Sequence, residues 1–268
     1  MDKTETIDKL PQTGLANSIG LVDADIIAYR CAAAGEEDEL DQVLISTENF
    51  IKDMYRRVNL GKYIFFLTGE GNFRYDVAKR KPYKGNRADM EKPRHLLDVK
   101  GFLTEYYNAF ICSGFEADDA LATCANRYGS SAVVMTIDKD LLQVPGYHYN
   151  FVKDERYFVS AQAGAYNLWK QVITGDTTDN IPGLPKFGPA KFDKFLLSNP
   201  NLSPAEAAWQ MYKDAGEEHP YFVEQMLLVR MLTDLQALPY EEHMVLDTFD
   251  HSRDDNAFTD NLEGFDDI

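Results

Sequence analysis

Eight acidic residues fall in four short clusters that are far apart in the chain. They are Asp23; Glu116, Asp118 and Asp119; Asp138 and Asp140; and Asp176 and Asp179. Such carboxylates could not share a small site as bare anions, because like charges a few ångströms apart raise the pKa of at least one partner. A divalent cation removes that penalty, and an all-oxygen ligand set selects Mg²⁺ or Mn²⁺ over zinc. Two such ions about 3.5–4 Å apart activate a water and stabilise the leaving oxygen of a phosphodiester.

Each cluster alone also has an ordinary structural interpretation. Acids at Glu116–Asp119 complement a helix dipole, and Asp138-Lys-Asp140 is typical of a helix cap with a surface ion pair. Asp23-Ala-Asp25 is compatible with a turn. After a strand it also suits a haloacid-dehalogenase-type phosphatase, with Asp23 as nucleophile and Asp25 as acid. The joint occurrence of four clusters at the starts of helices or the ends of strands favours a shared metal site.

The last two acids lie at the start of a segment dense in proline and glycine, Gly175–Phe192. Such a run folds as tight turns, and Pro189 can begin a helix at its first position. Backbone N–H groups in such turns can bind a phosphate. Taken alone, the segment is equally compatible with an ordinary loop that carries solvated acids.

The charge of the chain is segregated. The net charge is −17, but residues 74–100 hold nine Lys and Arg against four acids, whereas residues 241–268 hold ten acids and one Arg. In the basic segment, Lys and Arg side chains would contact the phosphates of a polyanion, and Tyr83 would stack on an exposed base or pack against a sugar. A solvated loop that uses its charge for solubility is the alternative.

The elements that must position these residues alternate between strand and helix. Apolar runs at 19–22, 63–67, 109–112 and 132–137 predict strands, with further strand-like pieces at 147–152 and 156–159. Helices are predicted at 40–58, 94–108, from 116 onward, and at 161–173, 204–215 and 221–235. This order implies an α/β core with a parallel sheet, followed by an all-helical region. Ligands gather beyond the carboxyl ends of parallel strands, so the acids are predicted to converge on one edge.

Five motifs in this order resemble the bacteriophage and bacterial 5′-nuclease family of flap endonucleases and 5′–3′ exonucleases, over about residues 19–197. They are Val22-Asp23, PYKGNR at 82–87, GFEADD at 114–119, TIDKDL at 136–141 and GDTTDNIPG at 175–183. The resemblance implies a PIN-like parallel-sheet core flanked by helices, with a C-terminal helical region containing a helix–three-turn–helix motif. It implies a Mg²⁺-dependent phosphodiester hydrolase that acts in replication on DNA with free 5′ ends, flaps or nicks. Whether RNA primers in an RNA–DNA hybrid are also removed is left open.

The resemblance also assigns residues. Asp23, Glu116, Asp118 and Asp138 would serve a first metal, with Asp119 close by, and Asp138, Asp140, Asp176 and Asp179 would surround a second. Two or more Mg²⁺ are expected, and Mn²⁺ should substitute. Lys84 and Arg87 would act as catalytic residues at the scissile phosphate. The implied DNA-binding set is Lys79, Arg80, Tyr83, Lys84, Arg87, Gly183, Lys186, Gly188 and Lys191. The hairpin at 183–191 would grip duplex phosphates and is a candidate K⁺ site.

The chain departs from the family pattern at three positions. Many members carry an Asp soon after the second strand, where this chain has Gly69-Glu70, and Glu70 could substitute. In the hairpin, Lys186 replaces a Gly and Ala190 replaces a Lys, with Lys191 one place later. A non-catalytic protein that binds branched DNA on the same fold is therefore a second functional hypothesis.

We expect four regions: an N-terminal extension at 1–18, a nuclease core at 19–174 with a basic arch segment at about 74–100, a helix–three-turn–helix region at 175–240, and a disordered acidic tail at 241–268. No apolar run approaches the roughly 20 residues that span a membrane, and three cysteines without metal-ligand spacing indicate reduced thiols. We expect a cytoplasmic monomer (host cytoplasm if phage-encoded). Phe265 and Ile268 could anchor the tail on a replication-protein partner, or the tail could only solvate.

Overall fold

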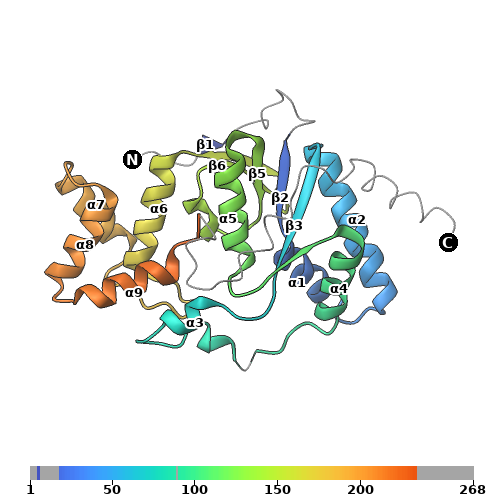
Figure 1. The fold of residues 1–268 in the computed structure, drawn as a ribbon, viewed down its shortest axis with the longest axis horizontal. Helices are drawn as coiled ribbons and strands as arrows, with labels where there is room; N and C mark the ends of the chain where they lie inside the picture. The colour runs from blue at the N-terminus through green and yellow to red at the C-terminus, as the bar shows by residue number, and fades with distance from the viewer. Residues whose placement is uncertain (1–4, 7–17, 89, 234–268) are drawn as a thin grey trace.

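The computed structural model describes residues 5–6, 18–88 and 90–233 (Figure 1). In these residues a seven-stranded sheet has the order β1-β7-β6-β5-β2-β3-β4. The strands are β1 (Glu5–Thr6), β2 (Ile19–Asp23), β3 (Lys62–Thr68), β4 (Phe110–Cys112), β5 (Ala132–Met135), β6 (Gly146–Asn150) and β7 (Glu155–Val159). The pairs from β6 to β4 are parallel, and β7 and β1 add antiparallel edges. The predicted α/β core is confirmed.

Helices cover both faces of the sheet, because side chains of alternate residues in a strand point to opposite faces. Val22 and Phe65 belong to one buried cluster, with residues of α1 (Ala24–Ala34), α2 (Leu40–Val58) and α4 (Leu96–Tyr107). Leu21 and Ile64 belong to the other, with residues of α5 (Ala117–Tyr128). In Figure 1, α1, α2 and α4 lie on one side of β2 and β3, and α5 crosses in front of the sheet.

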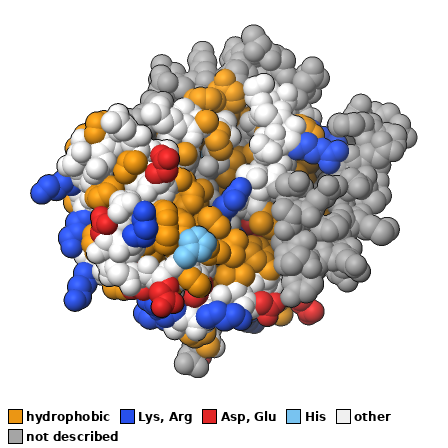
Figure 2. All heavy atoms as spheres, turned by 60° about the vertical axis from the view of Figure 1, so that its left-hand side comes forward, with side chains coloured by type: hydrophobic (Ala, Val, Ile, Leu, Met, Phe, Trp, Pro, Cys, Tyr) orange, Lys and Arg blue, Asp and Glu red, His pale blue; other side chains and the backbone are white. Residues whose placement is uncertain are grey.

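A second, all-helical body follows the sheet. It contains α6 (Ala161–Thr174), α7 (Pro189–Ser198), α8 (Pro204–Asp214) and α9 (His219–Val229), which share a third buried cluster. Aromatic stacking holds this body together, since the Trp169 and Phe222 ring centroids are 5.9 Å apart. From the side of these helices, hydrophobic side chains form a broad exposed area, with charged groups around and within it (Figure 2).

Most predicted elements are present within one to three residues of their expected ends. Two helices were missed: α1, and the short α3 (Phe73–Val77) inside the basic segment. The last helix was predicted to reach 235, but α9 ends at Val229. Part of the predicted N-terminal extension joins the sheet as β1. The acidic tail, including Phe265 and Ile268, lies outside the described residues. None of the helices in the described ranges combines the length and the apolar character needed to cross a membrane.

Candidate metal and nucleic-acid site

The ends of β2 and β5 meet through one hydroxyl group. Asp23 ends β2, and its Oδ1 accepts from the N–H of Ile26, so it caps α1 (3.2 Å). Its Oδ2 accepts from the Thr136 hydroxyl (2.8 Å), and that hydroxyl oxygen accepts from the N–H of Asp138 (3.0 Å). Since β2 and β5 are paired and parallel, Asp23 and Asp138 lie at the same edge, as the sequence predicted.

Glu116 brings the acids of α5 to this edge. It is the N-cap residue of the helix, in a capping box in which its backbone N–H donates to Asp119 (3.1 Å). Its carboxylate accepts from the Tyr83 hydroxyl (2.8 Å) and is ion-paired with Lys84. The first turn of α5 therefore joins the basic segment to the end of the sheet.

Asp119 does not lie open to a metal ion. Its side chain is fully buried, and each of its oxygens accepts two hydrogen bonds. Two come from the guanidinium of the buried Arg74 (2.6 and 2.8 Å), and two from the N–H groups of Glu116 and Leu232 (3.1 and 2.9 Å). With its lone pairs engaged in this way, Asp119 has a structural role in this conformation, and its predicted role as a metal ligand would require some of these bonds to break.

The acids Asp176 and Asp179 are held in a loop closed by two glycines. Gly175 and Gly183 both have positive φ (69° and 62°), and a Cβ on either would lie 2.3 Å from a backbone atom of the opposite segment. Asp176 and Ile181 exchange both backbone hydrogen bonds (2.8 and 2.7 Å) across this loop. Only glycine permits this approach, which explains the Gly-Asp-Thr-Thr-Asp-Asn-Ile-Pro-Gly spacing.

The basic segment docks on this acidic loop. Lys84 lies in the left-handed region (φ 52°), its N–H donates to the Asp179 carbonyl (2.9 Å), and its ammonium lies 3.8 Å from the Asp179 carboxylate. Arg87 donates to the same carboxylate (2.7 Å) and to the carbonyl of Thr178 (3.0 Å). Lys84 and Arg87 are therefore held by two acids, Glu116 at the start of α5 and Asp179 in the 175–183 loop.

Burial, and after it the repulsion of neighbouring acids, raises the pKa of three of these carboxyls. Burial raises the pKa of Asp23 to about 7, with added repulsion from Asp25 and Asp138. Burial raises the pKa of Asp140 to about 8, with contributions from Asp138 and Asp176. The pKa of Asp118 also rises well above its usual value, through burial first and then the charges of Asp23 and Asp138. These acids from three separate segments thus share one electrostatic site.

The N-terminal part of the chain matches a known protein family. The model of the 5′–3′ exonuclease N-terminal resolvase-like domain matches residues 18–168. The chain belongs to this family.

Curated members of the 5′–3′ exonuclease family are similar over about half of the chain. DNA polymerase I of Rhizobium leguminosarum is 33% identical over 143 residues, which are 47% of this chain and 14% of the polymerase. The flap endonuclease Xni of Shewanella piezotolerans is 30% identical over 140 residues, 46% of this chain and 54% of that protein. The chain thus spans only part of the length of these relatives.

Solved structures show the same fold. The bacteriophage T5 D15 flap endonuclease, in a complex with DNA and metal ions, has a TM-score of 0.65 at 17% identity. That match covers 92% of this chain and 98% of the T5 chain. A T5 D15 structure co-crystallised with metal ions has a TM-score of 0.61 at 16% identity, over 81% and 90% of the two chains.

The carboxylates of this 5′–3′ exonuclease domain fit a hard divalent cation, because they are oxygen donors whose repulsion such an ion would relieve. As the side chains stand, no three His, Cys, Asp or Glu residues in the described ranges are grouped closely enough to hold a metal. Glu116 and Asp179 instead contact Lys84, and Asp23 contacts Thr136. Metal binding by Glu116 and Asp179 would therefore compete with their ion pairs to Lys84, whereas Asp23 can keep its bond to Thr136 because a carboxylate has further lone pairs.

Two residues predicted to bind DNA are buried in the protein. The ring of Tyr83 is 4% exposed and packs edge-on against Tyr75, so stacking on a base does not fit this conformation. Its hydroxyl donates to Glu116 or Asp179 (2.8 Å to each), which gives it a role beside the acids. Gly183 is also buried: its N–H donates to Gln225 (2.9 Å) and its carbonyl accepts from Tyr221, so neither group is available to a phosphate.

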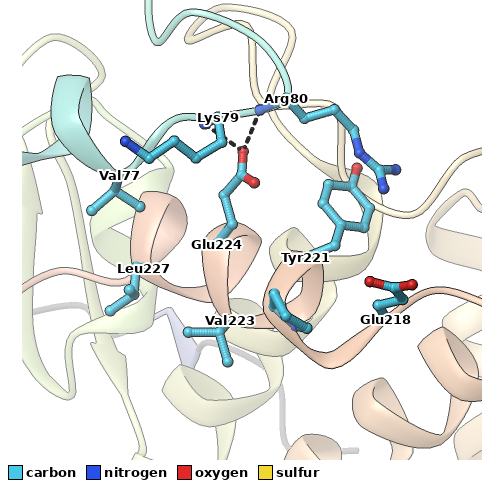
Figure 3. A pocket seen from close by; sticks show the side chains of 9 residues that line it. Val77, Lys79, Arg80, Glu218, Tyr221, Val223, Glu224 and Leu227 are labelled. Carbon is cyan, nitrogen blue, oxygen red and sulfur yellow. Dashed lines mark hydrogen bonds between the residues drawn. The ribbon is translucent and has the colours of Figure 1, made fainter.

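Arg80 and Lys79 are fastened to α9. The Arg80 guanidinium lies over the Tyr221 ring (3.3 Å to the centroid) and pairs with Glu217 (2.9 Å). The backbone N–H groups of Lys79 and Arg80 both donate to Glu224 (3.0 and 2.9 Å; Figure 3). A groove of about 560 Å³ lies between them and α9. The predicted phosphate contact of Arg80 would compete with Glu217, whereas the Lys79 ammonium points away from Glu224 (Figure 3).

The predicted duplex-binding hairpin ends at the start of α7. Gly188 is the N-cap and Pro189 the first helical residue, as predicted. Lys186 is exposed and has a positive φ (69°). Glycine adopts such a φ most readily, which agrees with the glycine that the family pattern has at this position. The Lys191 ammonium donates to the Lys186 carbonyl (2.7 Å) and lies 4.6 Å from the Phe187 ring centroid.

The departure at Gly69-Glu70 has a packing cause. A Cβ at position 69 would lie 2.6 Å from Ile111 and 2.7 Å from the Cys112 carbonyl, so an Asp there would require β4 to shift. The Glu70 side chain is exposed. The sequence analysis considered Asp25 only as a turn residue or as the acid of a phosphatase. In the structure Asp25 lies at the end of β3, where its carboxylate accepts from the Thr68 N–H (2.8 Å) and pairs with Lys100.

Proposed function

We propose that this protein is a Mg²⁺-dependent 5′-nuclease that hydrolyses phosphodiesters in DNA with a free 5′ end, flap or nick. The observation that carries this proposal is the shared site of Asp23, Asp118 and Asp140, which come from three separate segments and whose pKa values are all raised by burial first and also by the charge of Asp138. Family membership supports the reaction type, and the names of the relatives support flaps and 5′ ends as substrates. Mn²⁺ should substitute for Mg²⁺.

In this proposal, the ligands are Asp23, Glu116, Asp118, Asp138, Asp140, Asp176 and Asp179. Bound divalent ions would supply Lewis-acid activation of water and of the leaving oxygen. Thr136 orients Asp23 and Asp138 through its hydroxyl. The Tyr83 hydroxyl donates its one proton to Glu116 or to Asp179 and so orients one of these carboxylates at a time.

Lys84 and Arg87 would bind the scissile phosphate. Both now contact carboxylates, so a phosphate entering the site would exchange one anionic partner for another. The N–H groups at the start of α7, with Lys186 and Lys191, would bind the duplex at a fixed distance from the cut. The Lys191 ammonium already donates to the Lys186 carbonyl, so a K⁺ ion that used this carbonyl as a ligand would have to displace it.

The phosphatase alternative is disfavoured by the contacts of Asp25. Its carboxylate accepts the Thr68 N–H and pairs with Lys100, so it is not placed to act as the acid for a leaving group. We retain the non-catalytic DNA-binding function only as an outcome of the test.

A direct test uses a 5′-labelled flap duplex, a blunt duplex and an aryl phosphate, each with Mg²⁺ or EDTA. We expect Mg²⁺-dependent cleavage of the flap, no hydrolysis of the aryl phosphate, and loss of cleavage in Asp138→Ala. Cleavage of the blunt duplex as well would identify exonuclease activity on a plain 5′ end. Tight flap binding without cleavage in Mg²⁺ or Mn²⁺ would support the binding protein, and hydrolysis of the aryl phosphate alone would support the phosphatase. An RNA-primed version of the flap tests primer removal.

A further inference from the structure

The chain that leaves α9 is held from two sides. We refer to Val229–Thr233 as the C-terminal strap. On one side, Gln143 accepts from the Met231 N–H (2.9 Å) and donates to the Val229 carbonyl (3.1 Å). Bonds to alternate residues are typical of an extended chain, and Arg230–Thr233 has no helical structure.

The other side of the strap is bound by α3 and α5. Arg74 donates to the Arg230 carbonyl (2.9 Å), and the Leu232 N–H donates to Asp119 (2.9 Å). One turn further along α5, the Thr123 hydroxyl donates to the Leu232 carbonyl (3.0 Å). The residues between 229 and 232 are thus bonded alternately to Gln143 and to the Arg74–Asp119 pair.

The two sides carry different acids of the proposed metal site. Gln143 ends the short 3₁₀ helix η4 (Asp140–Gln143), and its amide also donates to the Asp140 carbonyl (3.1 Å). Asp119 lies in the first turn of α5, beside Asp118 and Glu116. The strap therefore connects the element that bears Asp140 to the helix that bears Asp118.

This connection acts against a repulsion. The acids on α5 and those at 138–140 are like charges that would move apart, whereas two bound ions require ligand spacing constant to a fraction of an ångström. The strap lies outside residues 18–168, to which the family model corresponds. The C-terminal region thus contributes to the scaffold of a site whose acids lie mostly in the family domain.

We propose that Gln143 is a positioning residue for the metal site: through the strap it sets the distance between the acids of α5 and those of η4. This inference rests on the proposed function for the identity of the ions. Gln143 need not touch an ion or the DNA, because its three bonds go to backbone groups.

The test is Gln143→Met, which keeps the length of the side chain and removes all three bonds. Mn²⁺ binding is measured by isothermal titration without DNA, alongside flap cleavage as a function of Mn²⁺. We expect the Mn²⁺ dissociation constant to rise at least tenfold, as for other residues that orient metal ligands. Cleavage should recover at high Mn²⁺, and the KM for flap DNA should stay within twofold of the wild-type value.

The matched control is Asn126→Ala, which removes a bond from α5 to the exposed end of the strap at Thr233 (3.3 Å). It should bind Mn²⁺ as the wild type does. If Gln143→Met does not fold, Thr123→Val decides, because it removes a single bond to the strap without leaving a cavity, and it should weaken Mn²⁺ binding severalfold.

Wild-type Mn²⁺ affinity in a folded Gln143→Met, or in Thr123→Val where that variant decides, would overturn the inference. The proposed function fails differently: a wild-type protein that binds Mn²⁺ and leaves the flap uncut contradicts nuclease activity, while the binding data still report on Gln143.

Discussion

Replacing Asp119 by Asn should destabilise the fold more than any other single exchange of a carboxylate. Arg74 is 1% exposed and Asp119 is fully buried, and their two bonds measure 2.6 and 2.8 Å. The substitution preserves shape but removes the nearer counter-charge of the buried guanidinium, leaving only the more distant Glu116 carboxylate at 3.5 Å. Breaking such a pair costs about 3–5 kcal/mol, a large part of the roughly 5–15 kcal/mol that stabilises a typical protein.

At roughly 2–4 °C for each kcal/mol in a chain of this size, the melting temperature should fall by about 6–20 °C. Urea and thermal denaturation followed by circular dichroism measure this change. The double variant Arg74→Met/Asp119→Leu should be no less stable than Asp119→Asn, because it removes both charges and leaves apolar side chains in their place.

The matched control is Glu217→Gln, which breaks the more exposed pair with Arg80. It should cost less than about 1 kcal/mol, since exposed ion pairs contribute little. An Asp119→Asn protein within 1 kcal/mol of the wild type would refute the view that this pair holds α5 against the basic segment.

Three further predictions concern other parts of the molecule. Burial lowers the pKa of His148 to about 4, below its ordinary 6.5, so between these values the unfolded chain binds the additional proton. The contribution of His148 to stability should therefore fall by about 2 kcal/mol from pH 7 to pH 5, while the raised pKa values of Asp23 and Asp140 act in the opposite direction. In urea titrations at the two pH values, His148→Gln should remove the His148 contribution, and the same pH dependence in wild type and variant would contradict it. Gly183→Ala should lower the free energy of unfolding by at least about 2 kcal/mol, because its Cβ would lie 2.3 Å from the Gly175 nitrogen. Gly101→Ala in α4, whose Cβ would have no atom within 4 Å, should raise it by up to about 1 kcal/mol. Equal changes in melting temperature for the two variants would contradict the closed loop. Lys84→Met should lower kcat on a flap by about 10²–10³-fold with a smaller change in KM. The control Lys79→Met should change kcat less than threefold. Similar decreases of kcat in both variants would show that general positive charge matters more than the position of Lys84.

The arrangement of acids at one sheet edge was predictable from sequence. Asp23 and Asp138 follow continuous apolar runs, and parallel strands place such residues together whatever their separation in the chain. The 175–183 loop was also recognisable, because its paired glycines permit a contact that no other residue allows. Local pattern and strand direction were sufficient for both.

What sequence did not reveal depends on tertiary contacts. Arg74 stands in a basic segment that was expected to contact phosphates or solvent, yet it is buried against Asp119 and the end of α9. Tyr83 is an aromatic residue among cations, as in base-stacking sites, yet its ring is buried against Tyr75. Gly183 was predicted to contact a phosphate, but its N–H donates to Gln225 and its carbonyl accepts from Tyr221, two residues far along the chain. The α1 helix was missed because its buried face consists mainly of alanines.

The central claim is that acids from separate segments hold divalent ions that cleave DNA at a free 5′ end. Single-turnover cleavage of a 5′-labelled flap, with enzyme in excess and Mg²⁺ varied from zero to saturation, tests it most directly. Asp138 is linked to Asp23 through Thr136 and contributes to the raised pKa of Asp140, so Asp138→Ala should reduce the rate at every Mg²⁺ concentration. We predict a wild-type rate that rises from zero with Mg²⁺ and a variant rate near zero throughout. Cleavage by the wild type in EDTA, or equal rates for the two proteins, would contradict the account.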